Sequence, residues 1–352
     1  MGSISHDDLP KPWVETPTIR SAPLSRAAGC NIYLKLDNLQ PSGSFKSRGI
    51  GNYMFRAISS PSPTTSTNGS STDTSLPIHF YCPSGGNAGL AAATSAIALS
   101  AKATIVVPNT CSPFMISKLK DLGADVVQTG ANFAEADAYL RTELLGKKGE
   151  RGVYVPPFDH PDIWTGASSI VEELSRQMEG VEVDGIVCNV GGGGLLCGIM
   201  EGLEVRKKSK LGKAKVLAIE TQGAESLYAS VQAGELVTLP KITSIATSLG
   251  APRVAAQCYE WTRRKEGQLI CETVTDGQAV MGVVNFLNDA RIFVEVACGA
   301  TIAPAYNGGL RKSLGKGLSD EEWKEKNIVL IVCGGSNIHL DLLNEYRKTY
   351  GV

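Results

Sequence analysis

The chain has 352 residues, of which 43% are hydrophobic and 20% are charged, so it can bury one large α/β core or the cores of two domains. Its formal net charge is -1 at pH 7, which leaves no basic surplus for binding nucleic acid or anionic lipid. A small and roughly neutral ligand is the partner that this charge balance favours.

The first segment with a chemical signal is a loop rich in glycine and serine, Pro41-Ser42-Gly43-Ser44-Phe45-Lys46-Ser47-Arg48-Gly49. It contains a lone lysine, Lys46, beside the aromatic ring of Phe45. A lysine that bonds covalently to an aldehyde must be neutral, and burial or a nearby cation such as Arg48 lowers its pKa toward that state. An ordinary basic loop after a strand is the alternative, and the loop by itself fits both interpretations.

After this loop the apolar pattern of Ile50, Tyr53, Met54 and Ala57 predicts a helix, and Ile78–Cys82 predicts a strand. The segment between them, residues 59–77, is of low complexity and rich in serine and threonine. Because such a segment cannot bury apolar area, we expect a solvated and mobile insertion in a helix-to-strand connection.

Strands and helices alternate over the rest of the chain. Short β-branched and apolar runs predict strands at residues 103–107, 124–128, 152–155, 185–190, 215–219 and 328–333. Helical patterns fall at residues 91–96, 115–122 and 132–145. This alternation predicts an α/β fold with parallel strands and helices on both faces of the sheet.

Three glycine-rich turns follow predicted strands, which is where ligands bind in open α/β sheets. The first turn reads Ser84-Gly85-Gly86-Asn87-Ala88-Gly89. Backbone amides at the start of the following helix, together with Ser84 and Asn87, suit a carboxylate. A tight turn that caps a helix is the simpler interpretation of this turn by itself.

The second turn consists of Gly191, Gly192, Gly193 and Gly194, followed by Leu195. A backbone without side chains can surround a dianion with N–H donors, and the helix dipole adds to the attraction. No Gly-Lys-Ser/Thr sequence follows, so this is not a nucleoside triphosphate loop. We interpret the turn as a cup for a phosphate monoester, and a dinucleotide site with Glu220 as its acidic residue is the weaker alternative.

The third turn, Cys333-Gly334-Gly335-Ser336-Asn337, follows the last predicted strand. A thiol at the end of a buried strand is most often part of the core. The two glycines leave room for a ring to approach Cys333, so the turn also suits a contact with a ligand.

The nine cysteines are odd in number and contain no CxxC pair, and the four histidines lack the spacing of a zinc site. This predicts reduced thiols in a cytoplasmic enzyme rather than disulfides. The first 13 residues are polar and contain no hydrophobic signal region, and no apolar run is long enough to span a bilayer. We therefore expect a cytoplasmic protein without a membrane partner.

In this order, the lysine loop, the first turn, the glycine cup and Cys333 resemble the fold-type II pyridoxal-5′-phosphate enzymes. Within them the sequence is most similar to the eukaryotic L-serine dehydratase/L-threonine deaminase family. The resemblance extends from about residue 16 to residue 340, through the stretches PSGSFKSRGIGN, SGGNAGLAAA, ATIVVP, VPPFDHPDIW, GGGGLLCG, ETQGAESL, LPKITSIATSLG, ACGAT and VCGGSNI.

This resemblance implies a tryptophan synthase β-like α/β fold. Its two domains would contain open, twisted and mostly parallel sheets flanked by helices. Residues 1–40 and 160–352 would form the large domain that binds pyridoxal 5′-phosphate, and residues 41–159 the small domain. Residues 310–352 would complete the large domain, so we expect no regulatory domain after it.

The resemblance also implies a role for each matched residue. Lys46 would form a Schiff base with the cofactor and then act as base on the substrate Cα. The first turn would hold the substrate through Ser84, Gly85, Asn87 and Ala88, with Ser84 also in a catalytic role. The remaining cofactor contacts would be Phe45 near the ring, Asn87 at the 3′-oxygen, Gly191 to Leu195 at the phosphate, and Cys333 at the pyridine nitrogen.

A neutral thiol at the pyridine nitrogen would not enforce its protonation, which limits carbanion build-up and favours β-elimination. The family often carries a monovalent cation such as K⁺. Glu220, Ala224 and Leu249 fall in the family segments that bind this cation.

Three residues depart from the family pattern on the substrate side. Pro83 replaces the first serine of a Ser-Ser pair, and Thr165 and Ala167 replace an acidic residue and a histidine. The sequence therefore leaves open which of serine, threonine or another β-substituted amino acid is the substrate.

We expect a homodimeric L-serine/L-threonine ammonia-lyase that releases pyruvate or 2-oxobutyrate and ammonia by α,β-elimination. A close alternative uses the same cofactor for elimination or replacement on another β-substituted amino acid, or for serine racemisation. More distant alternatives are a nucleotide-dependent oxidoreductase that uses the glycine cup and a non-catalytic protein that binds an amino acid.

Overall fold

The computed structural model describes residues 9–59, 76–265 and 267–352, so most of the predicted insertion at 59–77 lies outside the described residues. The chain divides into two compact units. Unit 1 comprises the described part of Met1–Val14 and Gln40–Gly166, and unit 2 comprises Glu15–Leu39 and Ala167–Val352. The domain boundaries expected from the sequence remain a prediction, and they differ from these units in residues 1–14, 40 and 160–166.

Unit 1 is built on a four-stranded parallel sheet with the strand order β5-β4-β3-β6. The strands are β3 (Ile78–Cys82), β4 (Lys102–Val107), β5 (Asp125–Gln128) and β6 (Arg151–Tyr154). Each was predicted from its apolar and β-branched residues. The two central strands, β3 and β4, are buried from their second residue onward, as that composition requires.

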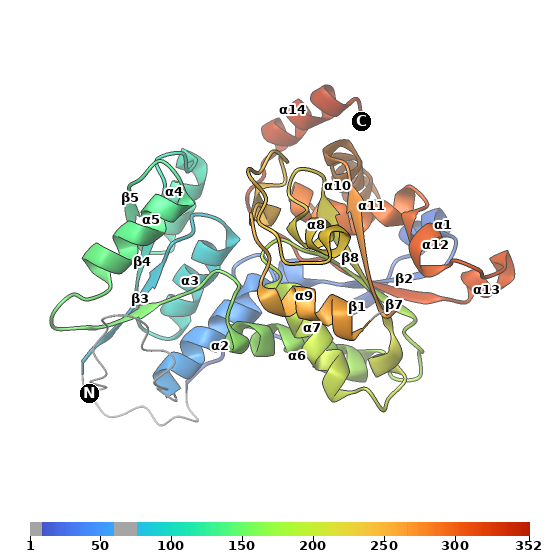
Figure 1. Ribbon diagram of the computed structural model, residues 1–352, viewed down its shortest axis with the longest axis horizontal. Coiled ribbons are helices and arrows are strands. Elements are labelled where there is room, and N and C mark those ends of the chain that lie inside the picture. The colour runs from blue at the N-terminus through green and yellow to red at the C-terminus, as the bar shows by residue number, and fades with distance from the viewer. Residues whose placement is uncertain (1–8, 60–75, 266) are drawn as a thin grey trace. The chain divides into compact units, whose positions relative to one another are not determined.

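Helices cover both faces of this sheet, as predicted (Figure 1). One apolar core joins β3 and β4 to α2 (Lys46–Ser59), α3 (Asn87–Ala98) and α4 (Pro113–Asp121). The core on the other face joins the sheet to α5 (Phe133–Tyr139) and η4 (Leu140–Leu144). The helix predicted at 132–145 is thus an α-helix in its first half and a π-helix in its second half.

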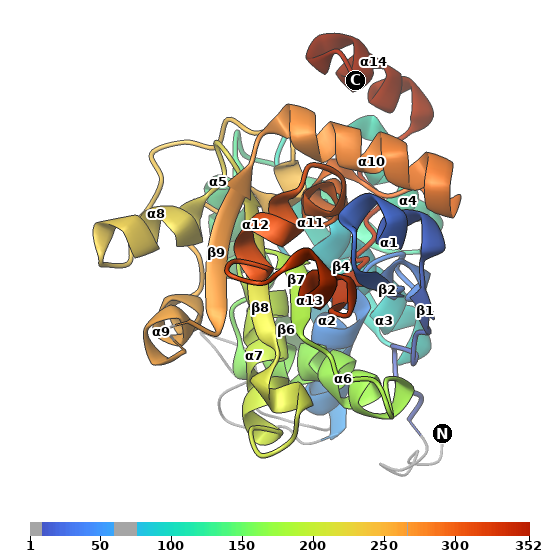
Figure 2. The ribbon, with the colours of Figure 1, turned by 90° about the vertical axis from the view of Figure 1, so that its right-hand side faces the viewer.

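Unit 2 is built on a six-stranded sheet with the order β1-β2-β10-β7-β8-β9, in which only the β1–β2 pair is antiparallel. Figure 2 shows β7, β8 and β9 side by side. The strands are β1 (Thr18–Arg20), β2 (Asn31–Lys35), β7 (Gly185–Asn189), β8 (Lys215–Thr221), β9 (Leu269–Val274) and β10 (Asn327–Ile331). The predictions located β7, β8 and β10 and missed the other three strands.

Helices lie on both faces of the unit 2 sheet. Figure 1 draws α6 and α7 on one side of the sheet and α10 and α11 on the other. The α-helices are α1 (Ala22–Ala28), α6 (Pro161–Gln177), α7 (Gly194–Val205), α8 (Ser226–Ala233), α9 (Ala256–Arg264), α10 (Asp276–Ala290), α11 (Val296–Tyr306), α12 (Gly309–Leu314), α13 (Asp320–Lys324) and α14 (Leu340–Tyr350). Short 3₁₀ turns are η2 (Asp37–Leu39), η5 (Leu211–Lys213) and η6 (Thr247–Leu249).

The structure corrects the local setting of Lys46. The sequence suggested a flexible loop up to Gly49, but α2 begins at Lys46. Turn hydrogen bonds from the N–H of Ser47 to Ser44 O (3.2 Å) and of Arg48 to Phe45 O (3.0 Å) lead into the helix. Gly49 occurs inside the helix because a Cβ there would lie 2.7 Å from Ile163 Cγ2, so close packing overrides its low helix propensity.

All nine cysteines are free thiols, and seven of them are buried. This agrees with the prediction of reduced thiols. Among the residues that the structure describes, no helix is both long and apolar enough to cross a bilayer.

Candidate active site

Lys46 lies at the carboxyl edge of the unit 1 sheet. Its Nζ donates a hydrogen bond of 2.5 Å to the carbonyl oxygen of Pro157, just after β6 ends at Tyr154. Burial raises the pKa of the Cys82 thiol at the end of β3 to about 12, and the Lys46 charge partly opposes this rise. The lysine therefore lies near the ends of two neighbouring strands, where ligands bind in parallel sheets.

Two aromatic rings flank the Lys46 amine. Nζ lies 5.4 Å from the centre of the Phe45 ring and 6.0 Å from the centre of the Phe158 ring. Rings at this distance attract the protonated amine, and they also displace water from around it. Phe45 was predicted to lie near the cofactor, whereas the sequence analysis did not identify Phe158.

The first glycine turn connects β3 to α3. Its Ser84 Oγ accepts a hydrogen bond of 3.4 Å from the N–H of Gly86, and α3 begins at Asn87 without a side-chain cap. A Cβ on Gly89 would collide with the carbonyl oxygen of Ser84, so the turn requires a glycine at that position. The start of α3 therefore presents backbone amides beside Ser84, the arrangement that binds a carboxylate.

Close packing also fixes the second residue of this turn. A Cβ on Gly85 would lie 2.6 Å from Cys111 Sγ and 2.9 Å from Val107 Cγ1. Asn87 and Ala88, predicted to contact the cofactor and the substrate, are buried in the first turn of α3. Ser84, Gly85, Asn87 and Ala88 thus lie together on one turn, at the same edge of the unit 1 sheet as Lys46.

In unit 2, the four glycines form the turn between β7 and α7. Gly193 is the N-cap of α7, has φ +94° and leaves the helix without a side-chain cap. A Cβ on Gly191 would lie 2.9 Å from Leu249 Cα, and a Cβ on Gly193 would collide with Cys258 Sγ. The turn therefore exposes only backbone groups at a helix N-terminus, which fits the predicted phosphate of the cofactor.

Cys333 lies two residues beyond β10 and is buried. Its Sγ accepts a hydrogen bond of 3.0 Å from Asn189 Nδ2. A contact with Cys298, burial and the Glu295 carboxylate raise the pKa of Cys333 well above its usual value, while the Asn189 hydrogen bond lowers it. The thiol is therefore neutral at physiological pH, and its role beside the cofactor remains a prediction.

The two glycines after Cys333 are needed for this turn. Gly334 and Gly335 have φ values of +82° and +108°, which favour glycine. A Cβ on Gly335 would collide with the Glu295 carboxylate. The backbone therefore passes closely over Glu295, whose Oε2 also accepts a hydrogen bond of 3.2 Å from the N–H of Asn337.

The three residues predicted to bind a cation are all buried in unit 2. The Glu220 carboxylate accepts hydrogen bonds from the N–H groups of Leu227 (2.9 Å) and Tyr228 (2.7 Å) at the start of α8. Burial raises its pKa to about 8, although these two hydrogen bonds act in the opposite direction. Ser226 Oγ is buried and has no hydrogen-bond partner among the described residues.

This set suits a monovalent cation better than a transition metal. A buried carboxylate and an unpaired hydroxyl oxygen are hard oxygen ligands. Within residues 9–59, 76–265 and 267–352 there is no group of three or more His, Cys, Asp or Glu side chains that could hold a metal ion. Ala224 and Leu249 could contribute only backbone oxygens, which leave no signal in the sequence.

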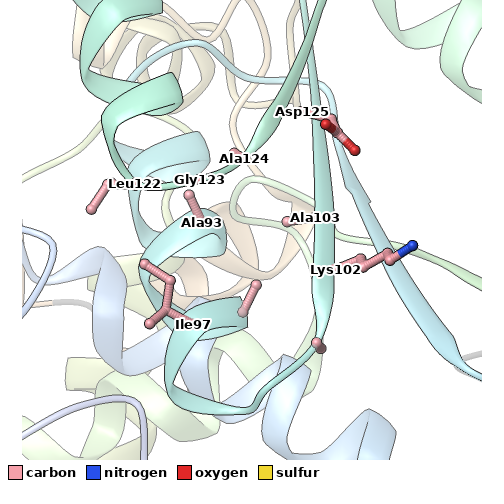
Figure 3. Close-up of a pocket in the computed structure, with 10 residues that line it drawn as sticks. Ala93, Ile97, Lys102, Ala103, Leu122, Gly123, Ala124 and Asp125 are labelled. Carbon is pink, nitrogen blue, oxygen red and sulfur yellow. The ribbon is translucent and has the colours of Figure 1, made fainter.

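A cavity of about 230 Å³ lies elsewhere in unit 1 (Figure 3). Ala93 and Ile97 of α3 line it together with Lys102 and Asp125, which begin β4 and β5. It therefore lies at the amino ends of the strands, the edge opposite Lys46, and we do not include it in the candidate site.

The residues that depart from the family pattern have different surroundings. Thr165 is exposed, whereas Ala167 and Pro83 are buried. Gly166, which lies between Thr165 and Ala167, must be a glycine. A Cβ at this position would lie 2.7 Å from Asn52 Cβ and would collide with Arg48 O. Positions 165 and 167 of this segment therefore carry neither a carboxylate nor an imidazole.

Sequence reasoning did not single out several residues that contact or neighbour the candidate site residues. Phe158 falls within the stretch VPPFDHPDIW but had no assigned role, and Ser226 lies two residues after Ala224. Asn189 contacts Cys333, which is 144 residues away in the sequence. Cys258 contacts Gly193, which is 65 residues away. Only the position of Asn189 directly before Val190 and the glycine turn could have drawn attention to it.

Comparison with known proteins gives consistent matches over nearly the whole chain. The family described as "Pyridoxal-phosphate dependent enzyme" matches residues 11–334. The chain is 44% identical to an L-serine dehydratase/L-threonine deaminase of Bos taurus, with 96% of each chain covered. It is 41% identical to the protein of that name from Homo sapiens, again with 96% of each covered.

Solved structures agree with these matches. A fungal L-serine ammonia-lyase from Rhizomucor miehei superposes with a TM-score of 0.83 and 35% identity, covering 96% of this chain and 99% of that chain. Such a score over nearly complete chains confirms the α/β fold-type II architecture expected from the sequence.

Proposed function

This chain belongs to the pyridoxal-phosphate dependent enzyme family, and we propose that it is an L-serine/L-threonine ammonia-lyase. The reaction is an α,β-elimination that converts the amino acid to pyruvate or 2-oxobutyrate and ammonia. One observation carries the proposal: the amine of Lys46 lies at the carboxyl edge of a parallel sheet, flanked by two aromatic rings, in a chain related to L-serine dehydratases over nearly its full length.

Residues in each unit, taken separately, suit one part of the cofactor. The side-chain-free turn from Gly191 to Leu195 would hold the phosphate, and Lys46 would hold the aldehyde carbon. Asn87 would bind the 3′-oxygen, and Phe45 would lie near the ring. When bound, the cofactor supplies an electron-withdrawing ring that makes the Cα proton of an attached amino acid acidic.

The chain's own residues then bind the substrate and move its protons. Ser84, Gly85 and Ala88 would hold the carboxylate at the start of α3, where the helix dipole favours a negative charge. Lys46, once free, would take the Cα proton, and the flanking rings of Phe45 and Phe158 would exclude water from around its amine.

Cys333 would determine the fate of the substrate after proton loss. Its raised pKa leaves a neutral thiol, which can donate a hydrogen bond to a ring nitrogen but cannot protonate it fully. Negative charge would therefore accumulate less on the ring than beside a carboxylate. Departure of the β-hydroxyl soon after proton loss is the outcome that this environment favours.

Four further features belong to the proposal. A monovalent cation, K⁺, would bind near Glu220, Ala224 and Leu249. The protein would act as a homodimer in the cytoplasm, a location that its free thiols favour. Its partner would be a small amino acid.

The proposal is tested by incubating the purified protein and pyridoxal 5′-phosphate with L-serine, L-threonine and D-serine in parallel. We expect ammonia with pyruvate from L-serine and with 2-oxobutyrate from L-threonine. Loss of both products on Lys46→Ala would assign them to this site. Oxo acid production that persists unchanged in this variant contradicts the proposal.

Racemisation or elimination on another β-substituted amino acid is the second candidate. The observation that favours it is the absence of the family's acidic residue and histidine at Thr165 and Ala167. D-serine formed from L-serine, with little ammonia, would support it. The family match gives no support to a nucleotide-dependent oxidoreductase.

A further inference from the structure

Asn189 is a buried amide at the end of β7, directly before Val190 and the glycine turn. Its Nδ2 donates two hydrogen bonds, one of 2.6 Å to the carbonyl oxygen of Ala297 and one of 3.0 Å to Cys333 Sγ. Ala297 lies in the first turn of α11, which packs on β7. One side chain therefore connects a strand end, a helix start and the thiol of Cys333.

The direction of these hydrogen bonds constrains the thiol. An amide N–H can only donate, whereas a thiol offers one hydrogen and the lone pairs of sulfur. Asn189 therefore occupies a lone pair of Cys333 Sγ, which leaves the thiol hydrogen to other acceptors, among them the neighbouring sulfur of Cys298. The second hydrogen bond of the same amide, to the Ala297 carbonyl, fixes the orientation of the Asn189 side chain.

We propose that Asn189 is a positioning residue for Cys333, one that keeps the thiol hydrogen available to donate to the pyridine nitrogen of pyridoxal 5′-phosphate. This inference rests on the proposed function, in which Cys333 faces that nitrogen. Without the Asn189 amide, the thiol is no longer held in this orientation, and its hydrogen bond to the ring nitrogen would weaken.

A double-mutant cycle tests whether Asn189 acts through Cys333. Asn189→Leu, Cys333→Ala and the double variant are purified without cofactor and titrated with pyridoxal 5′-phosphate. The growth of the visible absorbance band of the lysine-bound cofactor gives the dissociation constant. When Cys333 is present, we expect Asn189→Leu to weaken binding about three- to tenfold, the size of one hydrogen bond. In the Cys333→Ala background we expect the same change to have no further effect.

A matched control comes from another asparagine that donates to sulfur in unit 2. Asn285 Nδ2 donates to Met281 Sδ at 3.0 Å on α10, away from Cys333. Asn285→Leu removes a hydrogen bond of the same type and is expected to leave cofactor binding unchanged. Asn189→Asp covers the case in which the leucine variant does not fold: its oxygen accepts the thiol hydrogen, so it is expected to weaken binding at least as much.

The outcomes separate this inference from the proposed function. Equal losses with Cys333 present and in the Cys333→Ala background mean that Asn189 acts through the fold alone, which overturns the inference and leaves the proposed function in place. A wild-type protein that develops no visible band overturns both. A loss that disappears in the Cys333→Ala background supports the inference.

Discussion

The Nζ of Lys46 lies 2.5 Å from the carbonyl oxygen of Pro157, a contact that joins the start of α2 to the segment after β6. This hydrogen bond holds the amine at the carboxyl edge of the unit 1 sheet rather than in solvent. The hydrogen bond holds the amine at the site without a covalent bond. To react with an aldehyde, the amine must first break this hydrogen bond to Pro157. This arrangement and the glycine turn of unit 2 make the roles of individual residues testable.

Removal of the Ser84 hydroxyl is expected to weaken substrate binding. Ser84→Ala removes a donor for the substrate carboxylate, and hydrogen bonds to charged groups are worth about 1.5–3 kcal/mol, so kcat/KM should fall about 10- to 150-fold. The control is Thr94→Ala, farther along α3. It removes a hydroxyl that donates a hydrogen bond of 2.8 Å to Leu90 O. Steady-state kinetics with L-serine measure both, and equal effects of the two changes would refute the assignment.

Substitution of Gly193 is expected to weaken cofactor binding. Gly193→Ala adds a methyl group toward Cys258 Sγ at φ +94°, so it combines backbone strain with overpacking, together about 2–4 kcal/mol. Gly234→Ala is the matched control for the backbone strain. Gly234 also has a positive φ, +72°, but no atom lies within 4 Å of the Cβ that the substitution adds. We expect both to lower the thermal midpoint, and only Gly193→Ala to weaken binding of pyridoxal 5′-phosphate.

Potassium is expected to stabilise the protein through Glu220 and Ser226. Exchange of tetramethylammonium for K⁺ at about 100 times its dissociation constant should add about 2.7 kcal/mol to the free energy of unfolding. Glu220→Gln and Ser226→Ala should each reduce this gain. Thermal unfolding in the two salts at equal ionic strength measures the effect, and a gain that both variants retain in full would place the cation elsewhere.

Unit 1 is expected to lose stability in acid through Glu150. Burial acts to raise the pKa of this carboxylate, but hydrogen bonds from Tyr81 and His79 lower it below the ordinary 4.5. A lowered pKa stabilises the fold above pH 4.5, and this contribution disappears as the pH falls through the folded-state pKa.

Glu150→Gln should therefore lower the free energy of unfolding by about 1 kcal/mol at pH 7, because the carboxylate is largely but not fully buried. Below pH 4 the loss should be smaller. Amide hydrogen exchange of β3 at both pH values provides the measurement. Glu235→Gln, at an exposed position, is the control. A Glu150→Gln difference that does not change with pH would contradict this prediction.

The sequence predicted the strands that are buried and β-branched, because such strands have a strong local pattern. It missed β1, which has only three residues, and β9, whose composition LICETV mixes polar and apolar residues at a sheet edge. It also placed Lys46 in a loop rich in glycine and serine, but α2 begins at Lys46 and contains Gly49 and Gly51. Their need for close packing against Ile163 and Trp13 is a tertiary effect.

The candidate site could be predicted where a residue type is tied to its chemistry. Lys46, Ser84 and the glycine turn have such local signals. Asn189 and Ser226 have none, because the first acts through a partner 144 residues away and the second through an unpaired oxygen. Such roles depend on the packing of segments that are distant in the sequence, so they become visible only in the three-dimensional structure.

Covalent trapping at Lys46 tests the central claim most directly. The purified protein is incubated with pyridoxal 5′-phosphate, reduced with sodium borohydride, digested and analysed by mass spectrometry. We predict that the reduced cofactor is found on the peptide that contains Lys46 and is absent from this peptide in Lys46→Ala. An unmodified Lys46, or the adduct on other lysines alone, would contradict the assignment.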